Sequence, residues 1–286
     1  MGSHRLLRLH RPHLQPRGAA VLWARAALGQ CRADRALVDA ADALLAVLLA
    51  PVCACCARLL DHPTAGPVCP SCWQAVRAIT PPVCDGCGDP LPSWRAISVA
   101  TARCARCRRG PRAVDRGRAI GLYDGSLREI IHAWKYQGRR SIARALAARL
   151  RVEGAELLAG ADIAVPVPLH PRRRRARGFN QAADLARGLG LPVVEALRRV
   201  RHTRSQVELP AARRHGNVRD AFERGAPGRR WPGCPPFRSV EGLCVVLVDD
   251  VSTTGATLEA CARMLKAAGA REVRALTAAR VAGRRP

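Results

Sequence analysis

Two adjacent acids stand at the end of the clearest apolar strand in the sequence. Residues 245 to 260 read VVLVDDVSTTGATLEA, and the acids are Asp249 and Asp250. Removing a carboxylate from water is costly, so an acidic pair at the edge of a hydrophobic core calls for a partner. Ionised carboxylates accept strong hydrogen bonds from vicinal hydroxyl groups. The pair therefore indicates a site for a hydroxyl-bearing ligand.

The residues that follow the acids suit an anion. Ser252 to Thr257 form a small, hydroxyl-rich loop that is expected to open a helix. Backbone N–H groups at a helix start, together with threonine hydroxyls, bind phosphate well. An acidic nucleotide-hydrolysis motif and a chance strand-turn-helix are the other interpretations, but the chain has no Gly-Lys-Ser/Thr loop, which excludes the Walker type. We expect a ligand with hydroxyls at one end and a phosphate at the other.

Cysteines form the second constellation. Eight of the 13 lie in four Cys-x-x-Cys pairs, which are Cys53/Cys56, Cys69/Cys72, Cys84/Cys87 and Cys104/Cys107. Twelve residues separate the first two pairs and sixteen separate the last two, a spacing typical of closed tetrahedral zinc sites. The sequence predicts one or two structural Zn²⁺ ions. A purely structural clip is favoured because all-thiolate zinc is usually architectural, and a ribbon that touches nucleic acid is the alternative.

The remaining cysteines are interpreted as ordinary thiols. Cys55 stands beside Cys56 and leaves the ligand choice in the first knuckle ambiguous. Four others stand alone, namely Cys31, Cys234, Cys244 and Cys261. Of these, Cys244 is expected in a core strand and Cys261 on the last long helix, so neither is expected to be catalytic.

The elements that must position these residues alternate between strand and helix. We expect strands at 119–123, 162–168, 243–248 and 273–277, and helices at 33–50, 126–136, 142–151, 182–189 and 256–268; residues 193–197 are too short to assign. This alternation predicts an α/β fold with a parallel sheet flanked by helices. The acids would then lie at the carboxyl end of a strand, where such sheets bind ligands. A bend there would bring both carboxylates, which otherwise point to opposite sides, onto one sugar.

Composition divides the chain into three parts. Residues 1–32 are an Arg-rich extension, expected to be a disordered tail or the result of an early start codon, with an organelle transit peptide as the alternative. Residues 33–112 hold a short helix and a segment rich in Cys, Pro and Gly that needs a staple, and residues 113–286 form the α/β domain. Residues 202–218 and 225–240 fit no element, which is typical of lids or insertions.

Charge and hydropathy limit the classes of ligand and the location that we expect. The chain has 48 basic and 22 acidic residues, so its net charge is +26, and this excess calls for phosphates, nucleic acid or both. Five arginines, Arg172 to Arg175 and Arg177, form a plausible phosphate contact or else a solvated basic turn. No uncharged apolar run is long enough to span a membrane and no secretory signal is evident, so we expect a cytoplasmic protein.

Longer stretches of the chain resemble known families. The segment VVLVDDVSTTGATLEA is similar to the phosphoribosyl-pyrophosphate (PRPP) signature of type I phosphoribosyltransferases. Further upstream, four segments resemble the ComF family. They are HAWKYQG around Lys135, VPVPLHPRRRRARGFNQA at 165–182, RHTRSQVEL at 201–209 and RHGNVRDAF at 214–222. Members of that competence-associated family join a phosphoribosyltransferase-like domain to an amino-terminal double zinc ribbon. The resemblance covers about Leu37 to Val281.

This resemblance implies roles for individual residues. The acids Asp249 and Asp250 would hold the ribose hydroxyls, and Thr253, Thr254, Gly255, Ala256 and Thr257 would bind the 5′-phosphate. Pyrophosphate would face the end of the 162–168 strand with Arg172 and Arg177, and Mg²⁺ would bridge it to the ribose hydroxyls. Lys135 would also bind the substrate. Residues 203–217, with Arg214, resemble a hood loop over the reacting centre. The chain departs from the family pattern at Ser252, at Glu208 and in the insertion at 225–240, which leaves the reach of the loop uncertain.

Two functions follow from the resemblance. In the first, the protein is a PRPP- and Mg²⁺-dependent phosphoribosyltransferase that acts on an unidentified nitrogen acceptor. In the second, it is a non-catalytic adaptor that binds single-stranded DNA, with DNA-uptake or helicase proteins as partners. The intact acid pair and loop favour the first function, while the charge and the cysteine ribbon favour the second.

Overall fold

The computed structural model describes residues 35–91, 102–200, 222–224 and 239–281. These residues belong to two compact units, one with residues 35–51 and 61–65 and the other with the remaining described residues. In the first unit, a helix at 35–49 and the 3-10 turn η1 (Pro63–Ala65) are joined through Asp42, whose carboxylate accepts a 2.8 Å hydrogen bond from the Thr64 N–H. Within the described ranges no helix has the length and apolar character needed to cross a bilayer.

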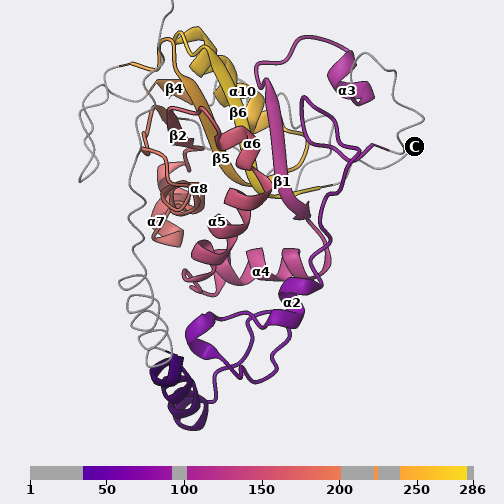
Figure 1. Ribbon diagram of the computed structural model, residues 1–286. Coiled ribbons are helices and arrows are strands. Elements are labelled where there is room, and N and C mark those ends of the chain that lie inside the picture. The colour runs from indigo at the N-terminus through magenta and orange to yellow at the C-terminus, as the bar shows by residue number, and fades with distance from the viewer. Residues whose placement is uncertain (1–34, 92–101, 201–221, 225–238, 282–286) are drawn as a thin grey trace, which may run out of the picture. The chain divides into compact units, whose positions relative to one another are not determined.

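The second unit is built on a four-stranded parallel sheet (Figure 1). Its strands, in spatial order, are β1 (Arg116–Leu122), β6 (Glu272–Arg280), β5 (Cys244–Ser252) and β2 (Ile163–Pro166). A separate antiparallel pair joins β3 (Leu197–Arg199) to β4 (Phe222–Arg224). The predicted α/β class with a parallel sheet is confirmed.

Helices cover both faces of this sheet. They are α4 (Gly125–Tyr136), α5 (Ile142–Glu153), α6 (Ala155–Leu158), α8 (Gln181–Arg187) and α10 (Ala256–Ala267). Helix α7 (Pro171–Arg177) has no buried residue, and α2 (Pro70–Gln74) and α3 (Ala105–Arg108) lie in the cysteine-rich segment. Apolar residues of α4, α5 and α8 form one core and those of α10 form the other. The sheet is therefore the middle of three layers.

Strand periodicity assigns the two acids to different faces. Along β5, Val245 packs in the core of α10, whereas Val246 packs in the core of α4, α5 and α8. Because successive strand residues point to opposite faces, Asp249 continues the first series and Asp250 the second. Strand β5 runs through both acids to Ser252, paired with β6, instead of bending at the acids as the sequence analysis expected.

Most predicted elements are present, with ends shifted by a few residues. The largest difference is α7, a helix that the sequence analysis did not assign; its five arginines were interpreted as a pyrophosphate or nucleic-acid contact or as a solvated basic turn. Pro171 fits the first helical turn, and the His170 ring accepts a 3.3 Å hydrogen bond from the Arg172 N–H. Gly178, with a φ of 77°, ends the helix in the left-handed region that glycine tolerates. The sequence analysis assigned no element to this segment because it has no apolar periodicity.

Candidate functional site

The two acids lie at the carboxyl end of β5 with a lysine beside them. Lys135, near the end of α4, places its Nζ atom 2.8 Å from Oδ2 of Asp250. The two side chains are only 12% and 15% exposed, so water screens this ion pair little. The Asp250 N–H donates a 2.8 Å hydrogen bond to Oδ1 of Asp249, which ties the two acids together. Lys135 was predicted to lie in this site, and the fold brings it there.

The pKa of Asp249 lies close to neutral pH. Burial, reinforced by the charge of Asp250, raises the pKa of Asp249 to about 7. The Asp250 N–H and the cations Lys135 and Arg199 act in the opposite direction. Arg199 belongs to β3 and is itself only 7% exposed. Sequence reasoning missed Arg199, because it lies just beyond a segment too short to assign.

The loop after the acids leads into α10. Gly255 precedes the helix with a φ of 74°, a conformation in which a side chain would be strained. The Ala256 N–H donates a 3.4 Å hydrogen bond to Oγ1 of Thr254, which stabilises the turn. Thr253, Thr254 and Thr257 are half-buried at the start of the helix. A hydroxyl-rich loop that leads into a helix start is an arrangement that suits a phosphate.

Basic side chains line a neighbouring cavity at the carboxyl end of β2. The cavity has a volume of about 420 Å³, and its lining includes Pro166, Arg174, Arg198 and Arg199. Of the arginines predicted to contact pyrophosphate, Arg172 is exposed on α7. Arg174, from the same cluster, reaches this cavity instead. The predicted hood loop at 203–217, with Arg214 and Glu208, lies outside the described residues, as do most of the 225–240 insertion, Cys31 and Cys234.

Arg177, which was predicted to face pyrophosphate, packs against Tyr136 of α4 and Gln181 of α8. Its guanidinium lies over the Tyr136 ring, 5.1 Å from the ring centroid, and donates a 3.1 Å hydrogen bond to the phenolic oxygen. It also donates to Oε1 of Gln181 at 3.2 Å. These contacts fix Arg177 against α4 and α8, and they do not show it reaching the acid pair.

Two groups of four cysteines have the geometry of metal centres. Cys53, Cys56, Cys69 and Cys72 form one group and Cys84, Cys87, Cys104 and Cys107 form the other, with all sulfurs of a group within 4.8 Å of one another. Sulfur–sulfur distances of 3.9, 3.8 and 3.7 Å match the edge of about 3.8 Å expected for a tetrahedron with Zn–S bonds of about 2.3 Å. The thiolates therefore fit two structural Zn²⁺ ions, paired in sequence order.

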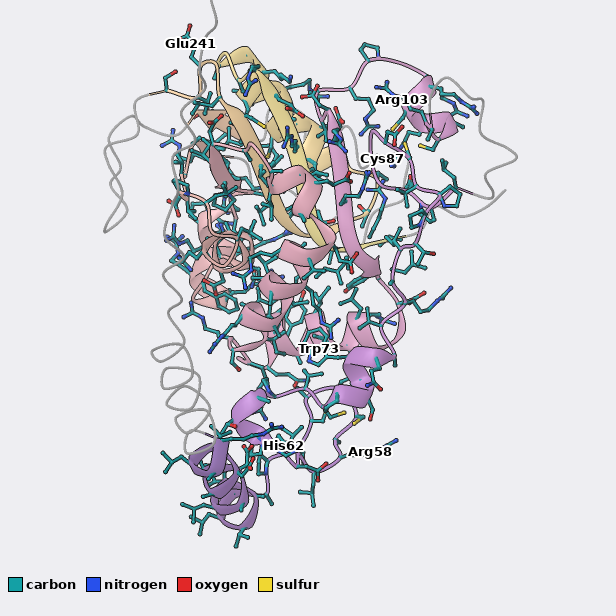
Figure 2. The ribbon with its side chains drawn as sticks, in the orientation of Figure 1. Arg58, His62, Trp73, Cys87, Arg103 and Glu241 are labelled. Carbon is teal, nitrogen blue, oxygen red and sulfur yellow. The ribbon has the colours of Figure 1, made fainter. Side chains whose placement is uncertain are left out.

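The first centre resolves the ambiguity at Cys55. Its sulfur is not one of the four that gather, and it lies 3.9 Å from the backbone oxygen of Ser126 on α4. Both centres lie in the second unit, and Figure 2 shows Cys87 of the second centre next to β1.

The sequence of this chain is similar to those of known proteins. Residues 175–286 match the phosphoribosyl transferase domain family, and residues 44–108 match the double zinc ribbon domain family. Competence protein F of Haemophilus influenzae is 30% identical over 216 residues, covering 72% of this chain and 87% of that protein. DNA utilization protein YhgH of Salmonella typhimurium is 33% identical over 219 residues, with the same coverage of 72% and 87%. A solved purine phosphoribosyltransferase from Pyrococcus horikoshii is 22% identical over 50% of this chain and 73% of that chain, at a TM-score of 0.26.

Proposed function

Because the chain belongs to the ComF family, we propose that it binds PRPP with Mg²⁺ and transfers the phosphoribosyl group to a nitrogen acceptor. The observation that carries this proposal is the continuity of the site. A strand delivers two acids, and within three residues of Asp250 the chain enters the glycine loop that opens α10. PRPP needs both features at this separation, since its ribose hydroxyls and its 5′-phosphate are neighbours.

The residues of the site would share the work of binding. Asp250, on the face of β5 that Lys135 reaches, would accept hydrogen bonds from the ribose hydroxyls, and Asp249, on the other face, would have to reach the same sugar around the end of the strand. The loop that opens α10 would hold the 5′-phosphate. Lys135 lies 2.8 Å from Asp250 and would turn toward pyrophosphate when the ribose takes its place. The acid oxygens and the phosphate-rich ligand suit Mg²⁺, which would supply charge neutralisation to the leaving pyrophosphate.

The transfer would depend on how the site positions the two reactants, and it would need no covalent enzyme intermediate. The bond from the anomeric carbon to pyrophosphate breaks, a bond from the acceptor nitrogen forms, and the acceptor proton leaves to solvent. The sugar carries positive charge as this happens, and the adjacent carboxylates would stabilise it. Since the pKa of Asp249 is raised to about 7, ligand affinity is expected to increase as the pH rises through that value.

Calorimetric titration with PRPP and MgCl₂ tests the proposal. The wild-type protein should release or absorb heat, and the double variant Asp249→Asn/Asp250→Asn should not. Asp61→Asn changes an exposed acid and serves as the matched control. An isotherm that is the same in the double variant and the wild type would rule the proposal out. Pyrophosphate release in the presence of candidate acceptors then separates catalysis from binding alone.

A second function, binding of single-stranded DNA, is supported by a basic groove. The groove runs between α5 and α8, and its lining includes the exposed side chains of Arg140, Arg144, Arg151 and Arg187. Arg144 and Arg151 are seven residues apart, so they lie on one face of the helix. The net charge of +26 and the names of the relatives, competence protein F and DNA utilization protein, point in the same direction.

Salt dependence tests the second function. Arg144→Gln/Arg151→Gln should weaken oligonucleotide binding and reduce the slope of log K against log salt by about 1.4, since each single-strand phosphate contact contributes about 0.7. Arg128→Gln removes an exposed arginine of α4 and should leave the slope unchanged. Equal slopes in all three proteins would exclude this groove as the DNA site.

A further inference from the structure

We infer that the second zinc ribbon is part of the phosphate site, and that Asp89 and Arg106 of the ribbon, with Arg280 of β6, are positioning residues for the loop at 252–255. This inference rests on the proposed function, because it assigns a role in PRPP binding to residues outside the acid pair and the loop. It is carried by a chain of contacts between the second cysteine group and the two ends of the loop.

The first contact holds the distal end of the loop. Arg106 lies between the zinc-ligand candidates Cys104 and Cys107 on α3, and its Nη1 donates a 2.8 Å hydrogen bond to the backbone oxygen of Thr254. Its other terminal nitrogen pairs with Oδ2 of Asp89 at 3.1 Å. One guanidinium therefore joins the loop to the ribbon through two separate donors, a geometry that its planar fork permits.

The second contact holds the proximal end. Arg280, the last residue of β6, is only 4% exposed. It forms an ion pair with the other oxygen of Asp89, and its Nη1 donates a 3.4 Å hydrogen bond to Oγ of Ser252. Asp89 thus bridges two arginines, and each arginine holds one end of the same loop. Because the carboxylate neutralises two largely buried cations, its loss would leave both uncompensated.

Close backbone packing fixes the ribbon against the sheet. Gly88, next to Asp89, has a φ of 72°, and a Cβ atom there would lie 2.5 Å from the Gly117 carbonyl oxygen on β1. A Cβ atom at Gly117 would lie 3.2 Å from the backbone oxygen of Cys87. Because neither glycine has a side chain, the backbone of the ribbon at Gly88 lies directly against the backbone of β1 at Gly117. The sheet therefore fixes the position of Asp89, the residue next to Gly88.

The carbonyl contact has a direct consequence for a phosphate. The Thr254 oxygen and the Gly255 N–H belong to one planar trans peptide group, so the direction of the oxygen sets the direction of that N–H. A carbonyl held by a cation at one side of this turn turns the following N–H to the other side. Arg106 would thus prepare the loop for an anion without touching the ligand.

Two measurements on Arg106→Gln test the inference. Hydrogen exchange of the loop amides, measured by mass spectrometry on the full chain without ligand, should become at least about tenfold faster than in the wild type. The affinity for PRPP with Mg²⁺ should fall by about tenfold, in line with the loss of one charge-assisted hydrogen bond. Arg108→Gln, an exposed residue on the same short helix, is the matched control and should change neither.

The outcomes separate the inference from the proposed function. Unchanged loop exchange in Arg106→Gln overturns the inference whatever PRPP does. Faster exchange in a protein whose wild type binds no PRPP overturns the proposed function while the loop anchor stands. Should Arg106→Gln lose zinc or fail to fold, Arg106→Lys takes its place, because a lysine keeps the charge beside Asp89 but cannot donate to both partners at once. Loop exchange equal to the wild type in Arg106→Lys, with zinc retained, also contradicts the inference.

Discussion

Replacing Asp249 by asparagine should stabilise the folded protein, and should do so more at alkaline than at acidic pH. The pKa of Asp249 is raised from the ordinary 3.8 to about 7, mainly by burial and then by Asp250. The folded state therefore holds a proton that the unfolded state has already lost between about pH 4 and pH 7. Stability falls over that window as the pH rises, and above it the full cost remains. Asparagine carries no charge and can still accept the 2.8 Å hydrogen bond from the Asp250 N–H.

The magnitude follows from the part of the window that can be measured. Acid conditions protonate thiolates and release zinc, so a practical range is about pH 6 to pH 8.5. Only the interval from about pH 6 to pH 7 lies below the folded pKa, and one pH unit corresponds to about 1.4 kcal/mol. Asp249 keeps some surface open to solvent, which screens part of this free energy. Between about pH 6 and pH 8.5, the stabilisation of Asp249→Asn relative to the wild type should therefore grow by about 1 kcal/mol. For a chain of this size that is about 2–4 °C in the melting temperature.

Thermal unfolding without ligand, followed by circular dichroism at several pH values, gives the comparison. The melting-temperature difference between Asp249→Asn and the wild type should grow toward alkaline pH. Asp61→Asn, which changes an exposed acid, should follow the wild type throughout. A difference that is independent of pH, or a variant that loses stability as the pH rises, would mean that Asp249 is already ionised and stabilised by Lys135 and Arg199, and the reasoning would be refuted.

Three further predictions concern the ribbon and the lysine. Cys104→Ser should release one zinc and weaken PRPP binding, whereas Cys56→Ser, in the first centre, should release one zinc and leave PRPP affinity unchanged; metal analysis and calorimetry check this, and equal affinity losses would contradict it. Lys135→Gln removes a cation that lowers the pKa of Asp249, so the pH at which PRPP affinity is half-maximal should move upward in titrations at several pH values, and a downward shift would count against the assignment. Gly88→Ala places a Cβ atom 2.5 Å from the Gly117 oxygen and should lower the free energy of unfolding by more than about 1 kcal/mol in urea titration, and an unchanged value would show that the contact is loose.

Local patterns predicted the sheet and the cysteine groups because both depend on spacing along the chain. Apolar runs marked the strands that became β2, β5 and β6, and four Cys-x-x-Cys pairs marked the metal centres. The helix α7 was missed because charged residues carry no apolar period, and its start and stop depend on Pro171 and Gly178. Strand β5 continues beyond the acids because it pairs with β6 as far as Ser252. This pairing depends on both strands together, so the sequence of one strand alone does not predict it.

The site was only partly predictable for the same reason. The acids, the loop and Lys135 lie in recognisable motifs, and the fold brings Lys135 to Asp250. Arg199 and Arg280 become neighbours of the site only through tertiary packing, each as a single arginine among many in a basic chain. Their roles depend on burial, and burial of one arginine cannot be inferred from a sequence in which nearly every cation is arginine.

The boundary between the ribbon and the α/β domain has a practical consequence for truncated proteins. Arg112 forms a 2.6 Å ion pair with Glu259, an acid in the first turn of α10 that is only 6% exposed, and the next residue, Ala113, donates its N–H to the same carboxylate at 3.0 Å. A protein expressed from residue 113 would lack this guanidinium and would leave a desolvated anion without its counter-charge. The α/β domain expressed from residue 113 should therefore be less stable than the same domain in the full chain.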